Sequence, residues 1–171
     1  VWHLGRALAA LRGGQRSEAR RELVAARRDM EVVQRKGARL KNTNSLADLL
    51  AIAADLVAAE LALSDGRHDE AVDLARAAVA AEDRLDFDEP PAWPMPARQV
   101  LAAVLIDGGR LAEAAQALRE DLARHPDNPW ALQGLSTTLR AQGESRAADK
   151  AQMAAQRTWR GTQIPPPRAR Y

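Results

Sequence analysis

A short pattern that occurs four times along the chain constrains the fold more than any other feature of the sequence. Each copy is a glycine, four residues that are mostly polar or small, and an alanine that begins an apolar stripe; the copies lie at 14–19, 66–71, 109–114 and 143–148. A helical pattern precedes and follows each copy. Because glycine readily takes the left-handed conformation that ends a helix, each copy predicts a turn between two helices. The sequence therefore predicts a series of helical hairpins.

The composition agrees with a helical fold. Hydrophobic residues make up 46% of the chain and aromatic residues 4%, so the core must be built mainly from Ala and Leu. Ala is the best helix former, and the residue types that favour strands are scarce. We therefore predict an all-α fold. The first helices of the hairpins are expected near 1–13, 45–65, 95–108 and 128–142, and the second helices near 16–35, 67–84, 110–124 and 145–160.

The spacing of the four turns points to a repeat family. Their glycines lie 52, 43 and 34 residues apart, and 34 residues is the period of tetratricopeptide repeats. Insertions explain the two longer spacings. The proline-rich stretch 85–93 accounts for nine extra residues, and the polar stretch 36–44 with a longer following helix accounts for the remaining eighteen.

Two further stretches extend this likeness. Residues 86–98 (DFDEPPAWPMPAR) and 121–132 (DLARHPDNPWAL), with the opening Trp2-His3, resemble long bacterial tetratricopeptide repeat proteins in which an acidic Glu-Pro-Pro-x-Trp loop leads into Pro-x-Arg. The resemblance covers most of residues 1–160. It implies a right-handed α-solenoid of about four antiparallel hairpins, near 1–35, 45–84, 95–124 and 128–160, with a proline-containing tail at 161–171. Since the chain opens within a helical pattern, we expect it to be a fragment of a longer protein. The resemblance implies that the fragment corresponds to the C-terminal part of such a bacterial protein.

Charge is distributed unevenly along the chain. Residues 1–44 hold eleven Lys or Arg against four Asp or Glu, and residues 45–95 hold three against twelve. The basic first hairpin could bind phosphates or an acidic protein surface, or it could be a solvated helix face beside an acidic neighbour. Residues 5–44 contain no aromatic side chain for stacking on bases, so we expect no nucleic-acid partner.

A solenoid of this kind presents its first helices to an inner groove. On that basis Leu4, Leu8 and Glu60 are candidate ligand-binding residues in the first two hairpins, and Trp130 and Arg140 are candidates in the last. Leu4 and Leu8 occupy the places where some tetratricopeptide domains hold Lys and Asn to clamp a C-terminal carboxylate. We therefore expect no clamp of that type.

The insertion 85–93 and the residues around it offer a second candidate site. Three acids precede two prolines that stiffen the segment, and Trp93 lies just before the next helix. The segment could form a rigid lip over the groove, with Trp93 supplying apolar contact and Arg98 binding an anion. Alternatively it is a packed connector, in which Trp93 covers the hairpin junction and Arg98 pairs with Glu89.

Metal and catalytic sites are not indicated. The chain has no cysteine, and its histidines, His3, His68 and His125, fall in different repeats with no pair at the spacing of a helical metal site. His3 remains a candidate groove or capping residue. No nucleophile motif or phosphate-binding glycine loop is present, so we expect no cofactor and no enzyme. No apolar run approaches about 20 residues, and we expect a soluble protein, cytoplasmic or periplasmic, that does not span a membrane.

The sequence thus predicts a protein- or peptide-binding scaffold. Groove leucines and Trp93 or Trp130 would supply apolar contacts, and Arg98 and Arg140 would bind acidic groups. An alternative is a substrate- or small-molecule-binding part of an enzyme whose catalytic residues lie elsewhere, which a closed pocket around Trp93, Arg98 and His3 would favour. Self-association through the terminal repeats is a further possibility.

Overall fold

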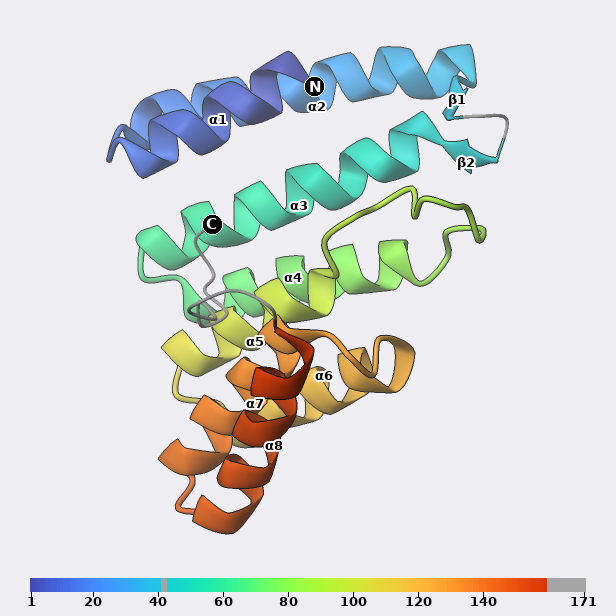
Figure 1. The fold of residues 1–171 in the computed structure, drawn as a ribbon. Helices are drawn as coiled ribbons and strands as arrows, with labels where there is room; N and C mark the ends of the chain where they lie inside the picture. Colours follow the sequence, from blue (N-terminus) through green and yellow to red (C-terminus); the bar gives the residue numbers. More distant parts are fainter. Residues whose placement is uncertain (41–42, 160–171) are drawn as a thin grey trace. The chain divides into compact units, whose positions relative to one another are not determined.

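The computed structural model describes residues 1–40 and 43–159, and the predicted tail at 161–171 lies outside them. The described residues form eight α-helices and one short antiparallel ribbon (Figure 1). The helices are α1 (Trp2–Arg12), α2 (Arg16–Lys36), α3 (Leu46–Ser64), α4 (His68–Glu82), α5 (Ala97–Asp107), α6 (Leu111–Arg124), α7 (Pro129–Ala141) and α8 (Ser145–Thr158). The predicted all-α class is confirmed, and each helix ends within two residues of its expected position.

The ribbon between α2 and α3 was not predicted. Its strands are β1 (Arg39–Leu40) and β2 (Asn44–Ser45), with Arg39 opposite Ser45. It lies in the polar stretch expected to be an insertion, and it brings Ser45 to the start of α3. There the Ser45 hydroxyl accepts a hydrogen bond from the Asp48 N–H and caps the helix. None of the described helices is long and apolar enough to cross a membrane.

The four glycine turns share one backbone geometry. Their glycines have φ between 72° and 83°, and in each turn the N–H of the following residue donates to a carbonyl five residues earlier. The pairs are Gln15 to Ala10, Arg67 to Ala62, Arg110 to Leu105 and Glu144 to Leu139. This is the hydrogen bond of a Schellman motif. The alanine that ends each sequence pattern is fully buried in all four cases: Ala19, Ala71, Ala114 and Ala148.

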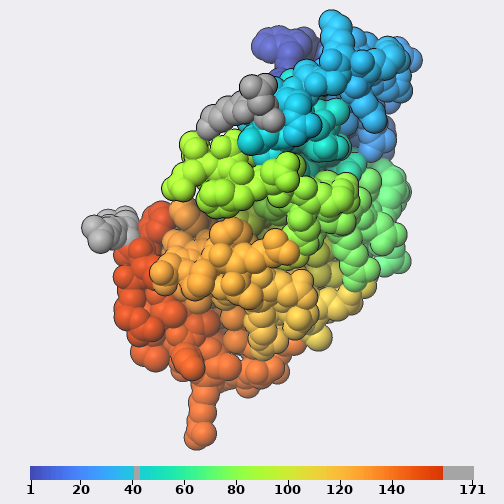
Figure 2. Space-filling view, turned by 90° about the vertical axis from the view of Figure 1, so that its right-hand side faces the viewer, coloured from blue at the N-terminus to red at the C-terminus, as the bar shows by residue number. Residues whose placement is uncertain are grey.

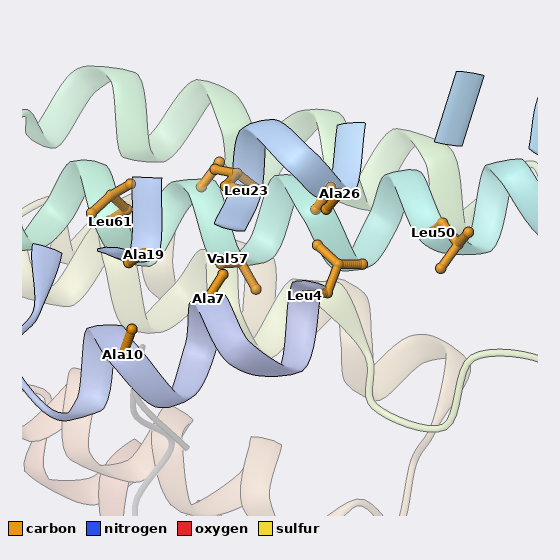
Figure 3. Close-up of a cluster of buried hydrophobic side chains, with 11 residues drawn as sticks. Leu4, Ala7, Ala10, Ala19, Leu23, Ala26, Leu50, Val57 and Leu61 are labelled. Atoms are coloured by element: carbon orange, nitrogen blue, oxygen red, sulfur yellow. The ribbon is translucent and has the colours of Figure 1, made fainter. Parts of the chain in front are cut away.

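The chain divides into two compact units, residues 1–97 and residues 98–171. In the first unit α1 packs on α2, both contact α3, and α3 packs on α4. Ala, Leu and Val side chains of α1, α2 and α3 meet in the core (Figure 3). The labelled core residues are Leu4, Ala7, Ala10, Ala19, Leu23, Ala26, Leu50, Val57 and Leu61. The core is thus built mainly from Ala and Leu, as the composition predicted.

In the second unit α6 packs on α7, and α7 packs on α8. Asn128 caps α7 by accepting hydrogen bonds from the N–H groups of Trp130 and Ala131, and Pro129 occupies the first turn. The connection from α6 to α7 is further held by the fully buried Asp121. Its carboxylate accepts from Asn128 Nδ2 at 3.1 Å and lies 2.9 Å from His125 Nδ1.

Candidate functional site

An apolar hollow lies at the N-terminal end of α1. Helix α2 has 21 residues and α1 has 11 in the given sequence, so the second half of α2 extends beyond Trp2, the first residue of α1. The hollow measures about 280 Å³ and opens to the surface. Figure 3 labels three of the lining residues: Leu4 of α1, Ala26 of α2 and Leu50 near the start of α3. The lining residues are Val1, Leu4, Ala26, Asp29, Met30, Val32, Val33 and Leu50.

The lining suits apolar side chains. Asp29 is the one lining residue with a charged side chain, and the others are Val, Leu, Met or Ala. Small-molecule pockets measure roughly 300–1,000 Å³ and enclose most of their ligand, so an open hollow of about 280 Å³ is at or below the lower limit. Val32, one of the lining residues, is 41% exposed. This geometry fits one or two side chains of a partner better than an enclosed ligand.

A charged seam runs along the α1–α2 pair beside the hollow. His3 Nδ1 lies 2.6 Å from Glu22 Oε2, and His3 Nε2 lies 3.8 Å from Asp29 Oδ2. Arg6 pairs with Glu22 at 2.8 Å and with Glu18 at 2.9 Å. The hydrogen bond with His3, followed by the charge of Arg6, lowers the pKa of the Glu22 carboxyl. His3, expected as a groove or capping residue, thus lies in an ion-pair seam at the edge of the hollow.

Acids of α3 pair with arginines of the first hairpin. Arg12 contacts the buried Glu60 at 3.3 Å, and Arg27 lies 3.8 Å from Asp55. Arg20 pairs with Asp65. Some of the basic residues in 1–44 therefore pair with acids of the neighbouring α3. This agrees with one of the two interpretations of the charge distribution. Glu60 was expected to face the groove, and the structure places it, nearly buried, in this contact between hairpins.

Burial and ion pairing shift the pKa values of Asp55, in α3, and Asp65, its C-cap residue, in opposite directions. The Asp65 pKa is lowered, chiefly by the hydrogen bond from Arg67 and further by Arg20. The Asp55 pKa is raised, because burial of the carboxyl outweighs the charge of Arg27. Burial thus disfavours the charged form of the Asp55 carboxyl.

The proline-rich segment is anchored within the first unit. Asn44 Nδ2 donates to the Asp86 carbonyl at 3.0 Å, and the Asp86 N–H donates to Asn44 Oδ1 at 2.8 Å. Thr43 Oγ1 donates to Asp88 at 3.3 Å. Figure 2 shows this segment, in lime green, packed against the cyan segment that contains Asn44. These bonds agree with a packed connector over at least its first half.

The other predicted residues are distributed over both units. Trp93 lies half-buried at the end of the proline-rich segment in the first unit, whereas Arg98 belongs to the second, where its Nε lies 3.7 Å from Glu120 Oε2. Trp130 packs edge-to-face on Trp159 with ring centroids 5.1 Å apart. Arg140 pairs with Asp149 at 2.8 Å. Their ligand-binding roles, and the lip formed by Trp93 and Arg98, remain predictions.

Of the predicted residues, Leu4 lines the hollow and His3 lies at its edge, whereas Leu8 packs against the core. The sequence reasoning did not single out Met30, Val32, Val33 or Leu50. A signal was present, because the apolar stripe of α2 continues from Ala26 to Met30 and Val33. Among the described residues, no group of three or more His, Asp or Glu is arranged to hold a metal ion.

Comparison with known proteins leaves the family open. No protein-family model matches the chain, and no curated protein matches it significantly.

Proposed function

We propose that the chain is a protein- or peptide-binding scaffold of the tetratricopeptide kind, a right-handed α-solenoid of about four hairpins within a larger bacterial protein. Two features support the architecture. The four turns repeat one hydrogen-bond pattern, and in the first unit α3 contacts both helices of the preceding hairpin. Stacked repeats bury their apolar faces in this way against neighbouring repeats.

The observation that carries the binding function is the apolar hollow beside α1. Burying one large apolar side chain contributes roughly 1.5–3 kcal/mol. Two such side chains would fill a hollow of this size, and part of their contribution offsets the entropy lost on association. A segment that docks here therefore gains useful affinity when it also contacts the surface around the hollow. An amphipathic helix, which offers apolar side chains along one face, meets that requirement.

Two valines of α2 provide a matched test. Val32 lines the hollow and is 41% exposed, whereas Val24 lies two turns earlier, is 52% exposed and is outside the hollow. The probe is a labelled helical peptide of about four turns, with Leu at i, i+3, i+4 and i+7 and Gln elsewhere. Its control has Ser in place of Leu. Binding is measured by fluorescence anisotropy with the full chain.

We expect the Leu peptide to bind and the Ser peptide to fail. Val32→Glu should weaken binding about tenfold, because a carboxylate would lie beside the apolar anchor, and Val24→Glu should leave it unchanged. Circular dichroism and the melting temperature of both variants establish that they fold. Absence of binding by the Leu peptide, or equal weakening by both variants, would contradict the proposal.

A further inference from the structure

We infer that Phe87 is the anchor of a second interaction surface, and that it enters an apolar pocket bordered by Lys or Arg on a partner protein. The surface is the stretch 86–89 of the proline-rich segment, together with the β-ribbon that holds it. None of these residues lines the hollow beside α1. The inference therefore goes beyond the proposed function and does not depend on it.

The Phe87 ring lies in solvent. Its side chain is 88% exposed, the largest fraction among the large apolar side chains that the structure describes. A single exposed apolar side chain is common and needs no special explanation. The case for Phe87 comes from how its backbone is held and from the charges beside it.

The residues on both sides of Phe87 are bonded to the ribbon. The Asp86 carbonyl accepts from Asn44 Nδ2 at 3.0 Å, and the Asp86 N–H donates to Asn44 Oδ1 at 2.8 Å. The Asp88 carboxylate accepts from Thr43 Oγ1 at 3.3 Å. Figure 1 shows the segment, in lime green, as a loop beside β2. An apolar side chain on a backbone that is already held loses less conformational entropy on binding than one on a free loop.

A second apolar side chain borders the same link. Leu40 lies opposite Asn44 in the ribbon and is 37% exposed. Interface cores are enriched in aromatic side chains and depleted of charged ones, which lie at the rim. A surface built on two apolar side chains is small compared with a standard interface of about 1,600 Å². We therefore expect a transient contact rather than a permanent one.

The charges around the ring specify the chemistry of the partner. Residues 85–96 contain no Lys or Arg and three acids, Asp86, Asp88 and Glu89. Two cations lie just before the segment or on the ribbon, Arg84 and Arg39, and each donates to a backbone carbonyl. Charges at the rim of an interface steer association and exclude partners of like charge. The acids therefore favour a pocket with a basic rim.

The experiment uses three cyclodextrin hosts as probes of this chemistry. All three offer the same apolar cavity, and their rims carry ammonium groups, unmodified hydroxyls or carboxylates. Phe87 is the only phenylalanine of the chain, so uniform labelling with para-fluorophenylalanine gives one fluorine NMR signal. Dissociation constants are obtained from its shift, with the full chain, at low and at physiological ionic strength.

We expect the ammonium host to bind Phe87 about tenfold more tightly than the carboxylate host at low salt, through a few exposed charge pairs. The unmodified host should lie between them, and salt should reduce the differences. Asp86→Asn combined with Glu89→Gln should abolish the preference, because it removes two exposed carboxylates beside the ring. The Asn44 bonds involve the backbone of Asp86 and should survive this change.

Asp69→Asn combined with Glu70→Gln is the matched control. It removes two exposed acids at the start of α4, whereas the ribbon leads into the start of α3. The 19 residues of α3, at about 1.5 Å per residue, separate these acids from the ribbon by far more than a Debye length. The control should therefore keep the preference for the ammonium host.

Four results would overturn the inference. The first is a fluorine signal that no host shifts, since Phe87 would then not be available to a pocket. The second is equal affinity for the three hosts, and the third is an equal loss of preference in both double variants. The fourth is a signal shifted by phosphatidylcholine vesicles and by no host, which would indicate a membrane surface instead. None of these results bears on peptide binding at the hollow.

Discussion

The side-chain amide of Asn44 pairs with both backbone polar groups of Asp86, 42 residues further along the chain, through bonds of 3.0 and 2.8 Å. Asn44 itself is almost fully buried. An amide that donates and accepts at once forms the same pair of bonds as a residue in a β-ladder. Through it the β-ribbon holds the proline-rich segment.

Replacing this amide should destabilise the first unit. Asn44→Asp keeps the shape but substitutes an acceptor for the donor, so the Asp86 carbonyl would face a buried carboxylate oxygen. We expect the free energy of unfolding to fall by about 1–3 kcal/mol, measured by urea denaturation. Thr43→Val, which removes the bonds of the neighbouring partly exposed hydroxyl, should cost less than about 1 kcal/mol. An Asn44→Asp chain as stable as the parent would show that the bonds to Asp86 contribute nothing.

Replacing glycine by alanine should change stability in opposite directions at two positions, although an added Cβ has room at both. A Cβ added at Gly66 or at Gly5 would meet no atom within 4 Å, but Gly66 has φ of +77° and Gly5 lies inside α1. Gly66→Ala should lower stability by about 1–2 kcal/mol because the left-handed conformation is unfavourable for alanine. Gly5→Ala should raise it by about 0.5–1 kcal/mol because alanine favours the helix. Melting temperatures that shift in the same direction would contradict this account of the turn.

The dependence of stability on pH should differ between Asp55, in α3, and Asp65, its C-cap residue. The Asp65 pKa is lowered in the folded protein, so its stabilising contribution is complete above the unfolded pKa and is lost as the pH falls through the folded value. The Asp55 pKa is raised. Its charged form opposes folding, and that cost disappears as the pH falls through the raised value.

Replacing each of these acids by Asn tests the two predicted directions of the pH dependence. Asp65→Asn should destabilise the chain at neutral pH, and its difference from the parent should shrink on acidification. Asp55→Asn should be neutral or stabilising at neutral pH, with a difference that also shrinks in acid. Urea midpoints between about pH 7 and about pH 3 span the ordinary carboxyl range. A strongly destabilised Asp55→Asn chain would mean that the contact with Arg27 outweighs burial, contrary to the direction given.

Features that depend on residues close together in the sequence could be predicted, whereas contacts between residues far apart in the sequence could not. The turns depend on one glycine and on the apolar period of adjoining helices, which are local, so the helices were located within two residues. The contact between Asn44 and Asp86 joins insertions 42 residues apart, and no local pattern indicates it. The segregation of charge predicted that a basic hairpin could meet an acidic neighbour, but it could not specify which arginine meets which acid.

The hollow was predicted only in part. Leu4 was named because it lies on a first helix, whereas Met30 and Val33 continue a stripe that was interpreted as core. Which residues of such a stripe line a hollow depends on the alignment of α1 and α2, which is a property of the packed pair.

The ion pairs between the first hairpin and α3 have a consequence for how the helices align. Asp55, Glu60 and Asp65 occur at five-residue intervals and meet Arg27, Arg12 and Arg20. Each such pair adds little stability where it is exposed. Sliding α3 by one turn would, however, separate all three at once and leave Glu60 buried without Arg12, which is costly. Together, the three pairs therefore favour one alignment of α3 against the first hairpin. An Ala- and Leu-rich interface without them would accept several alignments.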